Sequence, residues 1–240
     1  MFAGPNGSGK STLAERLVKK GHIPAYIFVN ADEIEKTLKE KHFINLEDYK
    51  INAEKQEFMS FISRSSLNEK IDISKTLLDF ENNIVVFPSA GIQKLNSYIA
   101  ASVAEFIREK LMGSGQDFSF ETVMSHKSKV DVLEKAKHFG YRTYLYYIST
   151  DDPSINIERV KIRVERGGHS VTEDKIISRY ISSLELLTNA IKASDRAFIF
   201  DNSGPTQKLI AEIANADQIK LYTNELPHWY IKYVENRLIM

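Results

Sequence analysis

The sequence predicts an α/β fold built on a doubly wound, mainly parallel sheet with a helical lid. Three observations predict it. Short apolar runs rich in β-branched and aromatic residues alternate with amphipathic helical stretches along the 240 residues. A glycine-rich loop at the start of the chain opens the first helix. No internal repeat or low-complexity tract interrupts this alternation, so we expect a single domain over residues 1–240.

The first predicted elements lie on either side of the opening loop. A loop of this kind normally follows a buried strand, and only residues 2–3 are available for the end of that strand. We therefore expect a strand that is cut short by where this chain begins. Residues 11–20 form an amphipathic helix that Gly21 ends. The apolar run at 25–30 predicts a buried strand, and the acids that follow it favour a helix over 31–38.

The central part of the chain is predicted from apolar spacing and from breakers. Residues 46–66 carry aromatic and aliphatic side chains at helical intervals, which indicates a helix. A strand over 84–87 is stopped by Pro88. A long amphipathic helix over 96–112 is closed by glycines, and a strand over 117–122 follows.

The last part repeats the alternation of helix and strand. Gly140 ends one helix, and a glycine pair separates two later ones. The expected elements are a helix at 127–139, a strand at 141–148, helices at 155–166 and 173–193, a strand at 197–201, a hairpin at 208–222 and a helix from 227.

Composition excludes several classes of function. The chain has 32 Lys and Arg against 32 Asp and Glu, and this balance argues against a broad nucleic-acid surface. The absence of cysteine excludes disulfides and thiolate chemistry. No apolar run is long enough to span a membrane and no secretion signal is visible, so we expect a cytoplasmic protein.

The opening segment has the spacing of a phosphate-binding loop, G-x-x-x-x-G-K-S. Backbone N–H groups of such a loop surround a phosphate, and the following helix adds partial positive charge. Lys10 would reach the β- and γ-phosphates, and the Ser11 hydroxyl would bind Mg²⁺. The candidate nucleotide-binding residues in this segment are Gly4, Asn6, Gly7, Ser8, Gly9, Lys10, Ser11 and Thr12.

Three polar clusters follow predicted strands and should meet at the carboxyl edge of the sheet. They are Asn30 to Asp32, Glu121-Thr122 and Asp201-Asn202. Each has a structural alternative, because Asp32 could cap its helix, Glu121 could be a solvated strand end, and residues 201–204 could be a simple turn. Together with the loop they favour phosphoryl transfer to a bound hydroxyl, with Asn202 on the nucleotide and Asn30 and Thr122 on the acceptor.

The two acids divide the chemistry between them in this interpretation. Asp32 would accept the proton of the attacking alcohol. Glu121 would orient the acceptor or a water bound to Mg²⁺.

Phosphoryl transfer also needs positive charge around the moving group, and the predicted helix at 155–166 can supply it. Arg159, Arg163 and Arg166 share one helical face, although the same face could be solvated and paired with nearby glutamates. We interpret residues 155–180 as a lid that brings arginines over the phosphates.

Two further residues belong to the predicted lid. Arg179 could add a cation from its second helix, and His169 would end the first helix or hold the lid in place.

These segments together resemble the zeta-toxin family of P-loop kinases, in its stand-alone "predicted ATPase" branch. The resemblance covers residues 1 to about 40 and about 96 to 204. It implies a P-loop nucleotide-kinase-like fold and an ATP- or GTP-dependent kinase, with Mg²⁺, that phosphorylates a hydroxyl of a UDP-activated amino sugar. The matching segments are GPNGSGKST, VNADEI, FSFETVMSH, AKHFGYRTYLYYIST, NIERVKIRVERGGHSVTEDKIISRY and FIFDNSG.

The resemblance also implies roles for single residues. Asp32 matches the catalytic base, Lys10 the phosphate lysine, and Arg163 the first of two lid arginines. The position of the second arginine falls near His169, where Arg166 or Arg179 would stand in. Glu121 and Thr122 match the acceptor-site Glu-Gly-Thr stretch, from which Val123 departs.

Two features lie outside the resemblance. Residues 42–95 look like a helical insertion that could cap the substrate or block access for a partner. No antitoxin-like helical segment is present, so any antitoxin would be a separate protein.

Two other functions fit the sequence less well. The chain could be a nucleotide-binding interaction or regulatory module that has no acceptor substrate. It could also be an inactive relic whose short first strand spoils the loop.

Overall fold

The computed structural model describes residues 1–24, 27–64, 78–168 and 170–238. Within it the chain divides into two compact units, one formed by residues 1–25 and 121–240 and the other by residues 26–120.

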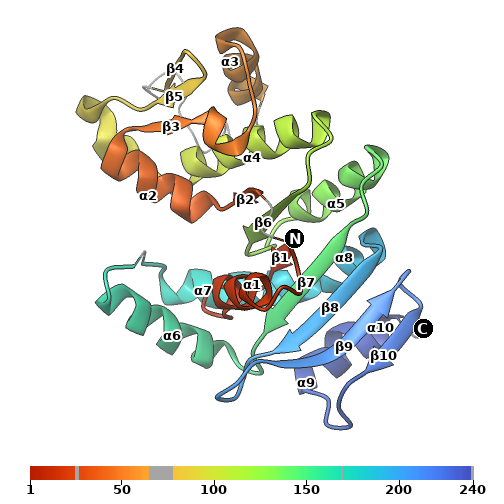
Figure 1. Cartoon of the computed structure of the whole chain (residues 1–240). Helices are drawn as coiled ribbons and strands as arrows, with labels where there is room; N and C mark the ends of the chain where they lie inside the picture. Colours follow the sequence, from red (N-terminus) through yellow and green to blue (C-terminus); the bar gives the residue numbers. More distant parts are fainter. Residues whose placement is uncertain (25–26, 65–77, 169, 239–240) are drawn as a thin grey trace. The chain divides into compact units, whose positions relative to one another are not determined.

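The first unit is built on a sheet with the order β10-β9-β8-β7-β1-β6. β6 pairs in parallel with β1, β1 with β7, and β7 with β8, whereas β9 and β10 run antiparallel (Figure 1). The predicted doubly wound, mainly parallel fold is therefore confirmed. The strands are β1 (Phe2–Ala3), β6 (Phe118–Thr122), β7 (Tyr144–Ser149), β8 (Arg196–Asp201), β9 (Lys208–Ala214) and β10 (Gln218–Leu221).

β1 is as short as the sequence predicts, and it is nonetheless a central strand. Phe2 lies opposite Glu121 of β6 on one side and Tyr146 of β7 on the other. Because β6 and β7 both end beside β1, the polar residues that follow these strands are brought next to the loop that leaves β1.

Apolar side chains of α1 (Lys10–Lys19) pack against strands β1, β7 and β8 of the sheet. Leu13 is fully buried and packs in one cluster with Phe2, Ile148 and Phe200. The ring of Tyr146 stacks on Phe2 and on Phe198, with both centroid separations 5.0 Å. Burial of these rings fixes the start of α1, and therefore the loop before it, against the carboxyl ends of the strands.

The other helices of the first unit follow the predicted order, with one correction. The predicted helix 173–193 is two helices, separated by a turn at Leu186, where ψ is near −9°. Apolar spacing continues across Leu186, so periodicity alone does not reveal the break. These helices are α5 (Ser128–His138), α6 (Pro153–Glu165), α7 (Glu173–Glu185), α8 (Leu187–Ala193), α9 (His228–Tyr230), a π-helical turn (Ile231–Glu235) and α10 (Asn236–Leu238).

The second unit combines helices with a small sheet. β2 (Ile27–Val29) pairs in parallel with residues 118–120 of β6, and three short strands form a separate antiparallel sheet with the order β3-β5-β4. The remaining elements are α2 (Ala31–Lys41), β3 (Phe43–Asn45), a 3₁₀ turn (Leu46–Tyr49), α3 (Lys55–Arg64), β4 (Asp79–Glu81), β5 (Ile84–Val86), a second 3₁₀ turn (Ser89–Lys94) and α4 (Ser97–Gly113).

The predicted insertion at 42–95 thus contains strands as well as helices, and its residues 65–77 lie outside the described residues. The helix predicted over 46–66 is wrong at its start. Asn45 caps only a short 3₁₀ turn, and Lys50 then adopts a left-handed backbone with φ 54°, which stops a continuous helix. The α-helix begins at Lys55.

In the part of the chain that the structure describes, no helix is both long enough and apolar enough to cross a membrane.

Candidate functional site

The loop between β1 and α1 is held from two sides by side-chain amides. Asn202 donates from Nδ2 to the Ser8 carbonyl at 2.7 Å, and Gln207 donates from Nε2 to the Gly9 carbonyl at 3.1 Å. On the other side, Asn156 donates to the Asn6 carbonyl at 2.6 Å. The loop conformation is therefore set by segments far away in the sequence.

Lys10, Ser11 and Glu121 form a polar cluster at the end of the loop. The Ser11 hydroxyl donates to Glu121 Oε2 at 2.9 Å, and Lys10 Nζ lies 3.9 Å from Glu121 Oε1. Lys10 also donates to the Pro5 carbonyl at 2.9 Å. The Lys10 and Glu121 side chains are only 7% and 12% exposed, so their charges interact in a low-dielectric environment.

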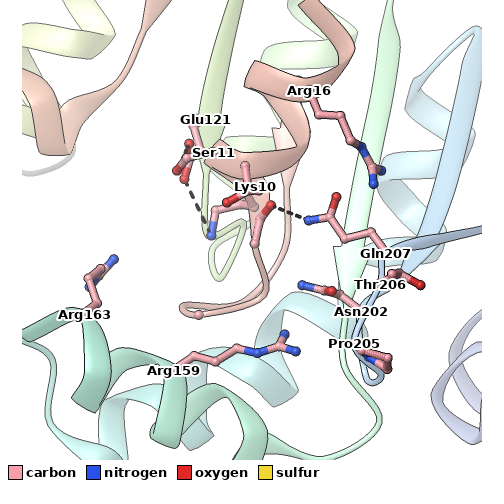
Figure 2. Close-up of a pocket in the computed structure, with 13 residues that line it drawn as sticks. Lys10, Ser11, Arg16, Glu121, Arg159, Arg163, Asn202, Pro205, Thr206 and Gln207 are labelled. Atoms are coloured by element: carbon pink, nitrogen blue, oxygen red, sulfur yellow. Dashed lines mark hydrogen bonds and ion pairs between the residues drawn. The ribbon is translucent and has the colours of Figure 1, made fainter. Parts of the chain in front are cut away.

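A cavity of about 520 Å³ opens beside this cluster, within the size range of small-molecule sites. Figure 2 shows Arg159 and Arg163 coming from α6 and Arg16 from α1. The lining residues are Gly7, Gly9, Lys10, Ser11, Thr12, Arg16, Glu121, Arg159, Arg163, Asn202, Pro205, Thr206 and Gln207.

The charge of the cavity favours an anion. Its described lining residues include the cations Lys10, Arg16, Arg159 and Arg163, and a single carboxylate, Glu121. Arg159 Nη1 is buried and donates no hydrogen bond to any residue that the structure describes. A buried, charged donor without a partner is costly, and phosphate oxygens would satisfy it.

Two of the three arginines predicted on one face of α6 line this cavity. Arg159 and Arg163 are half-buried there, whereas Arg166 is exposed at the C-terminal cap of α6 and is not one of the described lining residues. Of the three arginines, only the exposed Arg166 fits the alternative of a solvated face, and Glu158 pairs instead with Lys161 at 3.7 Å.

Of the other predicted lid residues, Arg179 lies near the loop. It donates from Nη1 to Asn6 Oδ1 at 3.5 Å, a weak contact. His169 lies outside the described residues.

The predicted acceptor residues Asn30 and Asp32 belong to the second unit. Asn30 is the N-cap of α2 and accepts the Asp32 N–H through Oδ1 at 2.9 Å. The alternative that Asp32 itself caps the helix is therefore wrong, and its carboxylate is in the first turn of α2.

The remaining predicted residues have mixed roles. The Thr122 hydroxyl accepts the Met124 N–H at 3.0 Å. Asp201 makes the turn that the alternative interpretation foresaw, accepting from Ser203 N at 3.1 Å and from Ser203 Oγ at 2.7 Å. Asn202, the next residue, lines the cavity. Gly4, Asn6 and Ser8 belong to the phosphate loop, but they are not among the described residues that line the cavity.

Sequence reasoning missed four lining residues, namely Arg16, Pro205, Thr206 and Gln207. Arg16 lies on α1 six residues after Lys10, where the amphipathic pattern marks it only as polar. The other three follow the Asp201-Asn202 cluster closely, and that proximity was the signal that could have found them.

The donor set fits the ligands that the sequence predicts. Ser11 Oγ and Glu121 Oε2 are adjacent oxygens of the type that Mg²⁺ prefers. The cations of the cavity suit a nucleotide's phosphates.

Comparison with known families decides the identity of the domain. Residues 1–187 match AAA_33, a family described as an AAA domain. The chain belongs to the AAA_33 family. The P-loop kinase-like fold predicted by the zeta-toxin resemblance is thereby confirmed for this AAA_33 domain.

Two relatives are similar in sequence. A guanylate kinase from Porphyromonas gingivalis is 24% identical over 169 residues, which cover 63% of this chain and 88% of that protein. An uncharacterised protein from Haemophilus influenzae is 36% identical over 63 residues, which cover 26% of this chain and 45% of that protein.

Solved structures support the same AAA_33 fold. A chain of the AvrRxo1-ORF1:AvrRxo1-ORF2 complex with sulphate ions has a TM-score of 0.59 at 14% identity, covering 97% of this chain and 62% of that one. A chain of the AvrRxo1-ORF1:-ORF2 complex with ATP has a TM-score of 0.55 at 15% identity and also covers 97% of this chain and 62% of that one. The chain thus spans less than two thirds of these structural neighbours and less than half of the Haemophilus protein.

Proposed function

We propose that this AAA_33 protein transfers a phosphoryl group from ATP or GTP to a hydroxyl of a small molecule. The observation that carries the proposal is the cationic cavity on the phosphate loop, where four basic side chains face one carboxylate. Such an excess of positive charge suits a triphosphate and the charge that develops during its transfer.

Six residues of the cavity have a defined part in the proposal. Lys10, Arg159 and Arg163 would neutralise the negative charge of the phosphate oxygens. Ser11 and Glu121 would hold Mg²⁺, which would supply positive charge against the phosphates. Asn202 would keep the loop in its binding conformation through its bond to Ser8.

Asp32 is proposed as the general base. The acceptor oxygen would bond to the γ-phosphorus while the bond from that phosphorus to the β–γ bridging oxygen breaks, releasing the nucleoside diphosphate. The acceptor's proton would go to the Asp32 carboxylate. Asn30, Glu121 and Thr122 are proposed on the acceptor side.

The acceptor is proposed to be a UDP-activated amino sugar. This class comes from the zeta-toxin resemblance of the FSFETVMSH and lid segments, and a separate antitoxin protein is proposed on the same ground. The neighbour with ATP supports the nucleotide, and its origin in a two-protein complex is in keeping with a protein partner.

The direct test is transfer of labelled phosphate. Purified protein would be incubated with Mg²⁺ and γ-labelled ATP or GTP, together with UDP-activated amino sugars, the same sugars without UDP, or GMP. We expect a product heavier by one phosphoryl group only with the UDP-sugars. Phosphorylated GMP would redirect the proposal to a nucleotide acceptor, in line with the guanylate kinase relative. Nucleotide binding without any transfer would favour the interaction module.

Asp32→Asn separates the proposed base from the nucleotide site. Removing only the proton acceptor should leave ATP affinity near that of the wild type while most transfer is lost, by about 100-fold or more. Lys10→Ala is the matched comparison, because it should weaken both ATP binding and turnover. Calorimetry with ATP and the transfer assay together measure both effects. Full transfer by Asp32→Asn would rule out its role as base.

A further inference from the structure

Asn156 is a fully buried side chain that uses both ends of its amide. Its Nδ2 donates to the main-chain carbonyl of Asn6 in the phosphate loop at 2.6 Å. Its Oδ1 accepts a hydrogen bond from the hydroxyl of Thr150, the residue directly after β7. Asn156 is 0% exposed and is not one of the described residues that line the cavity.

The backbone of the loop also packs directly on Asn156. A Cβ added to Gly7 would lie 2.6 Å from the Asn156 carbonyl oxygen, and the loop has φ 73° at that glycine. Only glycine allows this approach. The hydrogen bond and the close packing together hold the start of α6 against the loop.

A second layer fixes Asn156 itself. The Tyr180 hydroxyl of α7 donates to the Thr150 carbonyl at 2.7 Å, and Thr150 is fully buried. Thr150, at the end of β7, is thus hydrogen-bonded both to Asn156 of α6 and to Tyr180 of α7. Buried polar groups that are all satisfied in this way rigidify their surroundings.

The position of Asn156 on α6 links this network to the arginines. Arg159 and Arg163 follow it by three and seven residues, so all three lie on the same face of the helix. A helix anchored at Asn156 therefore holds Arg159 toward the loop before any ligand binds. The expected lid motion of residues 155–180 could then begin only after Asn156.

We propose that Asn156 is a positioning residue that holds Arg159 in register with the phosphate loop, so that phosphates meet a preformed cation site. It acts through Arg159 and touches no ligand. The proposal rests on the proposed function only in that the bound anion is the triphosphate of a nucleotide. It predicts that the contribution of Arg159 to binding depends on Asn156.

A double-mutant cycle with ATP tests the dependence. Asn156→Leu removes the amide at similar volume, and ATP affinity is measured by calorimetry for the wild type, Asn156→Leu, Arg159→Ala and the double variant. We expect Arg159→Ala to lower affinity about 10-fold or more in the wild type. In the Asn156→Leu background the same change should lower it by less than about threefold. If the loss of ATP affinity in the double variant equals the product of the two single losses within about twofold, the two residues act independently and the proposal is overturned.

A control and a milder variant complete the design. Thr188→Val removes another buried hydrogen bond, from the Thr188 hydroxyl to the Tyr233 carbonyl at 2.6 Å, away from the cavity. It should lower thermal stability but leave the Arg159→Ala effect unchanged. If Asn156→Leu does not fold, Thr150→Val, which removes only the hydroxyl that orients Asn156, carries the same test. A folded Thr150→Val protein with an undiminished Arg159→Ala effect contradicts the proposal. A wild-type protein that binds no ATP overturns the proposed function as well.

Discussion

At the scale of single residues, Arg159 best defines what the cavity can bind. Its Nη1 is buried, points into a site already rich in cations, and has no acceptor among the described residues. Water or a neutral ligand would leave the charge poorly compensated, whereas phosphate accepts several charge-assisted hydrogen bonds. The neighbouring Lys161 is different, because it is 54% exposed and lies 3.1 Å from Glu173.

Arg159→Ala and Lys161→Ala form a matched pair on one helix. Loss of a charge-assisted contact costs about 1.5–3 kcal/mol, so Arg159→Ala should lower ATP affinity about 10- to 100-fold. Lys161→Ala removes only exposed ion pairs and should change neither affinity nor stability measurably. Calorimetric titration of both variants with ATP checks this. Equal affinities for the two would remove Arg159 from the site.

At the scale of elements, the C-terminal end of α6 is shaped around Arg163. Gly167 has φ 83°, and the Gly168 N–H donates to the Arg163 carbonyl at 2.9 Å. A Cβ on Gly168 would lie 2.6 Å from Arg163 Cγ. The glycine pair that was predicted to separate two helices therefore also leaves room for the arginine side chain.

Gly168→Ala should displace both the side chain of Arg163 and its carbonyl oxygen, which would lie 2.9 Å from the added Cβ. A misplacement of about 1 Å in a catalytic group can cost up to about 100-fold in rate, so transfer should fall far more than thermal stability. Gly113→Ala is the control, since no atom of the described structure lies within 4 Å of the added Cβ and the residue is helical. It should be neutral or stabilising by up to about 1 kcal/mol. Unchanged transfer in Gly168→Ala would separate Arg163 from catalysis.

At the scale of the whole molecule, both ends of the strands of the first unit carry polar contacts between distant segments. The loop and cavity lie at the carboxyl ends, and Asp195 joins the amino ends of β7 and β8. Its Oδ2 accepts from Thr143 N at 2.7 Å and from Thr143 Oγ1 at 3.0 Å, and Lys137 lies 3.3 Å from Oδ1. Partial burial raises the pKa of Asp195, but the bonds from Thr143 and Lys137 outweigh it and leave the pKa below its usual value.

Asp195→Ala should therefore lower stability in a pH-dependent way. Because the folded pKa is depressed, the contribution of the carboxylate is present above the unfolded pKa of about 3.9 and is lost as pH falls through the folded value. We expect the variant to be less stable than the wild type by about 1 kcal/mol at pH 7. This difference should shrink below pH 4, with ATP affinity at pH 7 unchanged. Urea unfolding at pH 7 and pH 3 measures it, and a constant difference would contradict the role of the ionised group.

Much of this fold and part of its site can be predicted because the signals are local. Alternating apolar runs determine β7, β8 and α4, and glycine spacing determines the loop whose Lys10 and Ser11 line the cavity. Arg159 and Arg163 were found because helical periodicity places them on one face. Local signals failed where strands are short, as at β3 and β4, and where a single turn residue separates two helices, as at Leu186.

What the sequence by itself determined is the kind of domain, its phosphate loop and the cations available to it. Only the tertiary structure decided which of these groups meet. Ser11 meets Glu121 across 110 residues, Asn156 holds Asn6 across 150, and Gln207 holds Gly9 across 198. Contacts at such separations depend on how the strands are ordered in the sheet, which burial of the whole core selects and no short sequence window records.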